Sequence, residues 1–138
     1  MSHAFGHLFA SAFENVILIG SDLPALPLAL FDQAYGLLEK SAADVVLGPS
    51  ADGGYYLVGM KRMTTIIFDG IGWSGDDVLD QTIQKLAGVG LKHELLPEWY
   101  DIDTAHDLGR LQSEQNCRDV LMKNTFALLN ELRQKGRL

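Results

Sequence analysis

Short apolar runs mark out strands along the first two-thirds of the chain. Residues 16–19 are four consecutive apolar, mostly β-branched residues, a run long enough for a buried strand and too short for a helix. Runs at 44–49 and 55–60 predict a second and a third strand, and the partly alternating stretch 91–96 predicts a fourth.

Segments with helical periodicity alternate with these runs. Apolar residues spaced three and four positions apart predict helices at 4–13, 27–40, 74–87 and 115–138. Ser74 with Asp77, and Thr104 with Asp107, form the capping-box pattern that begins a helix. The order strand, helix, strand over residues 16–49 is a βαβ unit, whose two strands run parallel and are joined by a right-handed crossover. We therefore predict an α/β fold with a mostly parallel sheet.

Composition and charge narrow the class of protein. The 138 residues suit one domain with a real core, and 47% are hydrophobic, which is typical of a globular chain. The net charge of −7 argues against binding to nucleic acid or to an anionic membrane. The sequence has neither an apolar run of about 20 residues nor a signal-peptide pattern, so we expect a cytoplasmic protein. Cys117 is the single cysteine, which excludes an intrachain disulfide.

The first candidate for chemistry is the turn after the run at 16–19. Gly20 and Pro24 end the strand and leave Ser21 and Asp22 just past its carboxyl end. In open α/β sheets ligands bind in the crevice beyond these strand ends. Asp22 is therefore a candidate ligand for a divalent cation.

A second acidic stretch lies further along the chain, at residues 101–104. If this stretch is extended, Asp101 and Asp103 point to the same side, and two adjacent carboxylates repel each other unless a cation or a basic group lies between them. The alternative for Asp103 is that it helps to cap the helix that begins after Thr104.

Three further features have both structural and functional explanations. Asp52, Gly53 and Gly54 allow backbone N–H groups to approach a bound molecule, but they also suit a plain turn between two strands. Trp73 is suited to stacking on a base or a sugar, or to covering the core. His3 and His7 have the four-residue spacing of a metal clamp, but no nearby residue completes a ligand set, which favours ordinary surface histidines.

Four segments in order resemble a known family: GSDLP at 20–24, LGPSADGGYYLVG at 47–59, GIGWS at 70–74 and DIDT at 101–104. Together they resemble the DUF2064 group of GT-A-like transferases, relatives of the MobA-like nucleotidyltransferases and of 2-phospho-lactate guanylyltransferase. The resemblance covers roughly residues 1–113. We therefore expect a partial GT-A-like domain at 1–113 and a helical extension at 114–138.

The resemblance implies a three-layer, Rossmann-like, mostly parallel sheet and a Mg²⁺ or Mn²⁺ ion that bridges the protein and the phosphates of a nucleotide or nucleotide-sugar. By position, Asp22 resembles the metal-binding acid of the family, and Asp103 or Asp101 resembles the second acid. The loop at 52–55, which includes Tyr55, resembles the one that lines the acceptor or sugar pocket. Such chemistry needs no nucleophilic side chain, because the cation neutralises charge on the leaving phosphate.

The sequence departs from the family at its start. Members begin with another βα half and a basic, glycine-rich nucleotide loop, whereas this sequence begins at the helix before the central strand. A sheet truncated at the N-terminus in this way would expose an apolar edge. We therefore expect self-association or a companion chain that supplies the missing half.

Three functions remain open from the sequence. The first is a metal-dependent nucleotidyl- or glycosyl-transferase that is complete only when assembled, with Asp22 and Asp103 as catalytic residues. The second is a non-catalytic ligand-binding or assembly module with the same fold. The third is an unrelated α/β enzyme such as a phosphohydrolase, against which stands Pro24, since a second acid would be needed at that position.

Overall fold

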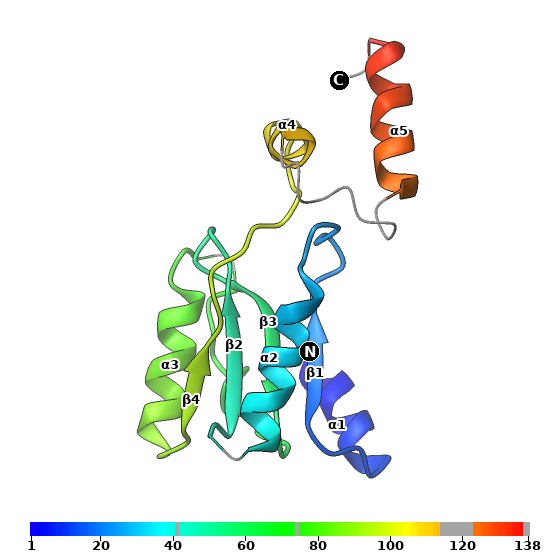
Figure 1. Cartoon of the computed structure of the whole chain (residues 1–138). Coiled ribbons are helices and arrows are strands. Elements are labelled where there is room, and N and C mark those ends of the chain that lie inside the picture. Colours follow the sequence, from blue (N-terminus) through cyan, green and yellow to red (C-terminus); the bar gives the residue numbers. More distant parts are fainter. Residues whose placement is uncertain (41, 74, 114–122, 137–138) are drawn as a thin grey trace. The chain divides into compact units, whose positions relative to one another are not determined.

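The computed structural model describes residues 1–40, 42–73, 75–113 and 123–136 of the chain. Its centre is a four-stranded sheet with the order β1-β3-β2-β4 (Figure 1). The strands are β1 (Val16–Ile19), β2 (Val45–Pro49), β3 (Tyr55–Met60) and β4 (His93–Leu95). The described helices are α1 (Ser2–Ala10), α2 (Leu28–Glu39), α3 (Val78–Gly88), α4 (Ala105–Ser113) and α5 (Lys123–Gln134).

Contacts divide the chain into two compact units. The sheet unit comprises Met1–Gly20 and Pro27–Tyr100, and the helical unit comprises Ser21–Leu26 and Asp101–Leu138. The helical unit is therefore discontinuous in sequence: the turn that follows β1 belongs with the segment that contains α4 and α5. The predicted boundary between residues 113 and 114 stays a prediction.

The sheet is mixed, so the prediction of a mostly parallel sheet was wrong. β3 pairs antiparallel with both β1 and β2, and only β2 and β4 are parallel neighbours. β1 and β2 do run in the same direction, but β3 lies between them. The cause is the short connection at residues 50–54, which is too brief for a crossover and forces β3 to fold back beside β2.

Helices pack on both faces of the sheet. On one face, Phe5 of α1 and Leu86 of α3 are fully buried with six other core residues: Val16, Val45, Leu47, Val58, Met60 and Ile67. On the other face, Leu38 of α2 comes so close to Gly59 of β3 that an added Cβ there would lie 3.1 Å from its Cδ1 atom. The apolar periodicity of the sequence thus identified buried residues of each helix, although Ala4 of α1 and Ala87 of α3 are exposed.

The observed ends of three helices differ from those that the apolar periodicity predicts. α1 stops at Ala10, and Ala12 adopts a positive φ of 62°, which ends the helix and leaves Phe13 exposed. α3 begins at Val78 with Asp77 as its N-cap, later than the predicted start at Ser74, which lies outside the described residues. Of the predicted helix at 115–138, residues 115–122 and 137–138 also lie outside them, and α5 occupies Lys123–Gln134.

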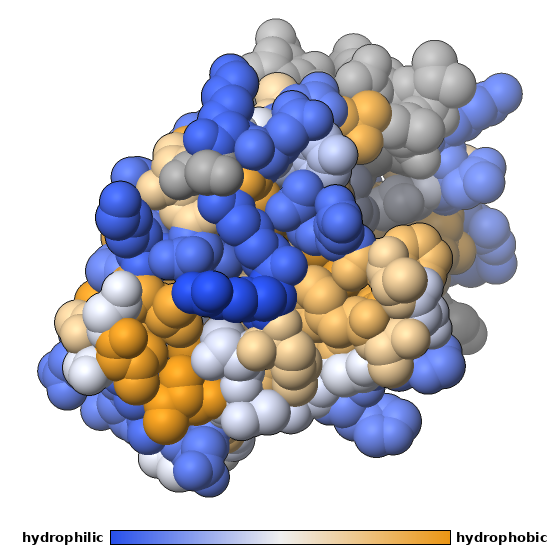
Figure 2. Space-filling model, turned by 90° about the horizontal axis from the view of Figure 1, so that it is seen from below, coloured by the Kyte–Doolittle hydropathy of each residue, from blue (hydrophilic) through white to orange (hydrophobic). Residues whose placement is uncertain are grey.

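Large apolar side chains also reach the surface of the chain. On the face drawn in Figure 2, hydrophobic surface forms separate areas divided by hydrophilic side chains. Exposed large apolar residues include Leu28, Phe13 and Ile19, with 63%, 59% and 47% of their surface accessible. Within the described part of the chain, none of the helices has the length and apolar character needed to cross a membrane.

The end of β2 depends on a close contact between Gly48 and Tyr56. The register of β2 with β3 shifts between Gly48 and Pro49, and the ring of Tyr56 then occupies the space beside Gly48. Tyr56 is buried, and its hydroxyl donates a hydrogen bond to the carbonyl oxygen of Pro97 (3.0 Å). The ring is therefore held in place, and a Cβ at position 48 would overlap it.

We expect Gly48→Ala to lower the free energy of unfolding by about 1–3 kcal/mol, since overpacking a fixed ring forces backbone or rotamer strain. Urea denaturation followed by circular dichroism measures the change. Gly88→Ala is the matched control, because no atom lies within 4 Å of a Cβ at that position at the end of α3. The control should be neutral or stabilise by up to about 1 kcal/mol. Equal effects of the two substitutions would contradict the packing argument.

α4 begins with the predicted capping box. The Asp107 carboxylate accepts hydrogen bonds from the backbone N–H of Thr104 (2.8 Å) and from its hydroxyl (2.6 Å), and the Asp107 N–H donates to the Thr104 hydroxyl (3.3 Å). The hydrogen bond from the Thr104 hydroxyl is the largest of the effects that hold the pKa of Asp107 below its ordinary value of 3.8. The ionised Asp107 carboxylate therefore stabilises the fold fully at pH values above its ordinary pKa, and this stabilisation is lost as the pH falls through the lower pKa of the folded state.

We expect Thr104→Val to raise the pKa of Asp107 towards its ordinary value, because the substitution removes the hydroxyl donor and keeps the side-chain shape. A pH titration of the Asp107 carboxyl resonance by NMR measures the shift. An unaltered pKa of Asp107 would contradict the hydrogen-bond assignment.

Candidate functional site

Three aspartates converge within the helical unit. Asp22, Asp101 and Asp103 each offer a carboxylate oxygen, and these oxygens all lie within 4.8 Å of one another. We call these residues the acidic cluster. Among the described residues, this is the one group of three or more histidines, cysteines or acids with such a geometry. The structure thus brings together the three acids that the sequence suggested as metal ligands.

The backbone of two distant segments holds the acidic cluster. Asp22 lies in the turn after β1, where the N–H of Leu26 donates to the carbonyl oxygen of Leu23 (3.1 Å) and tightens the chain. The N–H of Ile102 donates to the carbonyl oxygen of Asp22 (3.0 Å), which ties the turn to the segment between the other two acids. The position of Asp22 relative to Asp101 and Asp103 is therefore set by a backbone hydrogen bond.

The donor set fits a hard divalent cation. Carboxylate oxygens are the ligands that Mg²⁺ and similar ions prefer, and two oxygens bound to one octahedral ion lie about 3.0 Å apart at adjacent positions and about 4.2 Å apart at opposite positions. Small side-chain rotations would bring the oxygens, now within 4.8 Å of one another, to these spacings. Asp22 and Asp103 are exposed, and Asp101 is half-buried and takes part in a further interaction. The chemistry of the acidic cluster thus suits a divalent cation. The side chains of Thr104 and Asp107 cap the start of α4.

The turn at residues 50–54 forms a second candidate region, in the sheet unit. Asp52 accepts a hydrogen bond from the N–H of Gly54 (3.0 Å), and the N–H of Gly53 donates to the carbonyl oxygen of Ser50 (3.1 Å). Both glycine N–H groups are thus engaged inside the turn. Gly53 has a φ of +88°, and a Cβ there would overlap the carbonyl oxygen of Asp76. Gly53 therefore allows the turn to lie close to the loop before α3.

An aromatic group lies in the same unit. Trp73 is 47% exposed, and its ring contacts Tyr55 edge-on and Phe68 in a stacked arrangement, each with centroids 6.3 Å apart. The hydroxyl oxygen of Tyr55 is buried and has no well-formed hydrogen bond among the described residues. Burial raises the pKa of Tyr55 to about 12, and the nearby Thr82 side chain opposes the shift. Tyr55 is therefore a neutral phenol at physiological pH.

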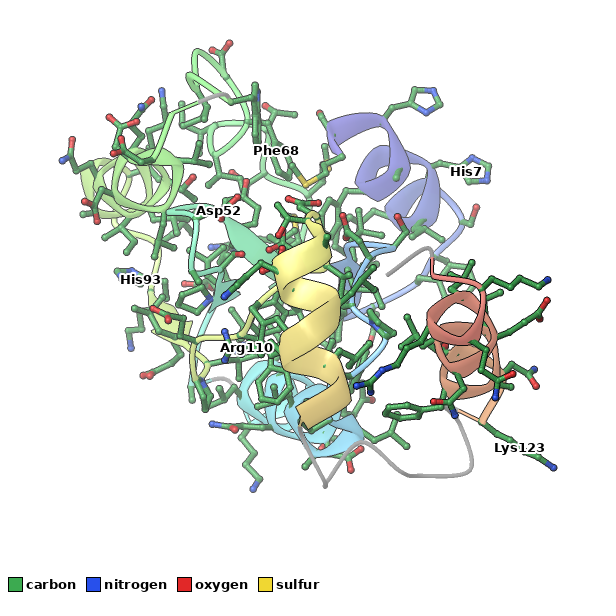
Figure 3. All side chains as sticks on the ribbon, turned by 90° about the horizontal axis from the view of Figure 1, so that it is seen from above. His7, Asp52, Phe68, His93, Arg110 and Lys123 are labelled. Carbon is green, nitrogen blue, oxygen red and sulfur yellow. The ribbon has the colours of Figure 1, made fainter. Side chains whose placement is uncertain are left out.

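The predicted site residues fall into these two regions. Ser21, an exposed residue, precedes Asp22 in the helical unit, whereas Asp52, Gly53, Gly54, Tyr55 and Trp73 belong to the sheet unit. His7, suggested with His3 as a metal clamp, is exposed on α1 and projects outward in Figure 3. The histidine pair belongs to no metal-like group among the described residues.

Sequence reasoning missed two residues that shape these regions. Ile102 was overlooked, although the pattern acid, apolar, acid at 101–103 signals a side chain that packs inward between two that point outward. Asp76 was also overlooked, and no pattern in the sequence indicates that its carbonyl oxygen lies against Gly53.

Comparison with known proteins places the chain in a family. Residues 1–75 match the family described as "Uncharacterized protein conserved in bacteria (DUF2064)". The match includes Asp22, Asp52 and Trp73, whereas Asp101 and Asp103 lie beyond it. None of the curated proteins matches the chain.

A solved structure is similar over 97% of the chain. It is the crystal structure of a "putative nucleotide-diphospho-sugar transferase" from Desulfovibrio desulfuricans G20, with a TM-score of 0.84 and 35% sequence identity. The present chain spans 58% of the length of that protein. The fold is thus a mixed α/β fold similar to that transferase, and because the family match extends over more than half of its residues, the chain belongs to the DUF2064 family.

Proposed function

We propose that the protein is a metal-dependent nucleotidyl- or glycosyl-transferase that uses a nucleotide donor. The observation that carries the proposal is the convergence of Asp22, Asp101 and Asp103 to within 4.8 Å. Membership of the DUF2064 family and the 35% identity to a structure named for nucleotide-diphospho-sugar transfer support the reaction class.

In this proposal, the acidic cluster holds a Mg²⁺ or Mn²⁺ ion. When bound, such an ion neutralises charge on the donor phosphates as the leaving group departs. Asp22 and Asp103 act as the exposed ligands, and Asp101 contributes a half-buried third carboxylate. Ser21, next to Asp22 in the turn, offers a hydroxyl donor to a phosphate oxygen.

We further propose that the turn at 50–54, with Tyr55 and Trp73, contributes to binding of the acceptor or sugar. Trp73 presents an exposed aromatic surface, and the contacts with Tyr55 and Phe68 fix its orientation. Asp52 uses one carboxylate oxygen within the turn, through Gly54, and is exposed. An exposed aromatic surface suits the apolar face of a ligand, and an exposed carboxylate suits its hydroxyl groups.

We expect Asp22→Asn to weaken binding of Mn²⁺ by about 100-fold, because it removes a charged ligand from the acidic cluster. Calorimetric titration of the full chain with Mn²⁺ measures the affinity. A second titration adds a panel of nucleotide sugars to the Mn²⁺-loaded protein, where Trp73→Ala should weaken only this second binding step.

The matched control is Asp32→Asn, which removes an exposed carboxylate from α2 and should leave both titrations unchanged. Absence of Mn²⁺ binding by the wild-type chain, or equal affinities of wild type and Asp22→Asn, would refute the metal site. Binding of Mn²⁺ without any binding of a nucleotide sugar would refute the donor assignment.

The second candidate function is an assembly module, and the edge of the sheet favours it. Among the described residues, β1 pairs with β3 alone, so its other side is an open edge. The strand is apolar throughout and carries no charge, proline or glycine, the usual devices that protect an edge from pairing. Ile19 is 47% exposed at this edge.

The hydrogen-bond pattern identifies the groups that the edge offers. Gly20 donates its N–H to the carbonyl oxygen of Tyr56 (3.0 Å), directly opposite in the register. Bonded positions alternate along an antiparallel pair, so the backbone groups of Ile17 and Ile19 face the open edge. A second copy of β1 can pair antiparallel about a two-fold axis through Leu18, with Ile17 opposite Ile19 of that copy. The side chains of each pair of opposite residues then lie on the same face of the combined sheet.

We expect the wild-type chain to form dimers through β1 and Ile19→Lys to give the mass of a single chain, because a charged side chain blocks edge pairing. Size-exclusion chromatography with light scattering measures the mass. Leu28→Lys is the control, since it places the same charge at a more exposed apolar position outside the strand and should remain dimeric. A monomeric wild-type protein would refute the assembly proposal.

A further inference from the structure

Ile102 connects the three aspartates of the acidic cluster. It lies between Asp101 and Asp103 in sequence, and its N–H donates to the carbonyl oxygen of Asp22 (3.0 Å). One residue therefore links all three members of the acidic cluster, two through the chain and one through a hydrogen bond.

The side chain of Ile102 packs into a small hydrophobic core. Leu111 of α4 and Leu129 of α5 are its buried members, with 0% and 4% of their surface accessible. Four partly buried residues pack against them: Ala25, Ile102, Leu108 and Phe126. α4, α5, the segment that holds Asp101 and Asp103, and the turn that carries Asp22 thus all contribute to this core.

The segment that holds Asp101 and Asp103 is anchored on both sides of Asp103. Ile102 precedes Asp103 and is fixed by the core, and Thr104 follows it and is fixed by the three hydrogen bonds of the capping box with Asp107. Asp103 is therefore attached directly to the start of α4. Its position cannot change without disturbing either the core or the cap.

We propose that Ile102 is the positioning residue of the acidic cluster, through which the core formed by α4 and α5 sets the affinity of Asp22, Asp101 and Asp103 for a divalent cation. This inference rests on the proposed metal site. It assigns to α5, which supplies none of the three carboxylates, an indirect effect on cation binding through Ile102.

The physical reason is the cost of bringing like charges together. Three carboxylates within 4.8 Å repel one another, so the segments that carry them separate unless other contacts hold them. The core and the Ile102 hydrogen bond contribute such contacts. A smaller side chain at position 102 weakens the attachment, and the carboxylates then spend less time at the spacing that a cation requires.

The test is a Mn²⁺ titration of the full chain followed by electron paramagnetic resonance, with far-UV circular dichroism on each variant. We expect Ile102→Ala and Leu129→Ala each to weaken Mn²⁺ binding by about tenfold, the range seen when groups that orient metal ligands are removed. Ile102→Val, which keeps most of the apolar side chain, should retain an affinity between that of wild type and Ile102→Ala.

Leu128→Ala is the matched control for Leu129→Ala. It removes the same atoms from the next position of α5, where the side chain is 55% exposed, and should bind Mn²⁺ as wild type does. The control separates an effect of the core from a general effect of shortening side chains on α5.

Several outcomes separate this inference from the proposed function. If the wild-type chain fails to bind Mn²⁺, the metal site itself is refuted. If wild type binds and both Ile102→Ala and Leu129→Ala bind equally well, with unchanged dichroism, the positioning role is refuted while the site stands. An equal loss in Leu128→Ala, or no recovery in Ile102→Val, would also overturn the positioning role.

Discussion

The short turn between β2 and β3 is the constraint on which the sheet depends. Because residues 50–54 reverse the chain at once, β3 must lie antiparallel beside β2, and β1 can join the sheet only on the far side of β3. β1, β2 and β4 then run in one direction, so their carboxyl ends lie at one end of the sheet. Gly53 makes the turn possible, since its positive φ and missing side chain let it lie against Asp76.

Local patterns predicted the elements well, and they predicted the pairing of strands poorly. β3 was predicted at its observed bounds and α2 to within a residue, because apolar runs and helical spacing report burial directly. The cap of α4 was also predicted, since Thr104 and Asp107 interact over three residues. The position of β3 between β1 and β2 was not, because an apolar run does not specify which strand lies beside it. β1 and β2 run in the same direction as predicted, but β3 lies between them and is antiparallel to both, so the sheet is not mostly parallel.

The candidate site shows the same division between local and long-range information. Asp22, Asp101 and Asp103 were recognised as acids in suitable places, and the structure brings them together. The sequence did not reveal the contacts that hold these acids together, which are a hydrogen bond from Ile102 and a small core that includes Ala25, Leu111 and Leu129. Their roles as metal ligands remain proposals. The apolar packing of this small core does not depend on charge, and it holds the carboxylates together against their mutual repulsion.

The discontinuity of the helical unit has a consequence for biosynthesis. The turn at Ser21–Leu26 leaves the ribosome before the segment from Asp101 onward, which emerges only after α2, β2, β3, α3 and β4 have been made. Contacts between segments so distant in the chain form late, because the entropy of closing the long loop must be overcome first. A nascent chain therefore carries Asp22 as an isolated carboxylate, and the acidic cluster forms only after residues 101–103 have been synthesised.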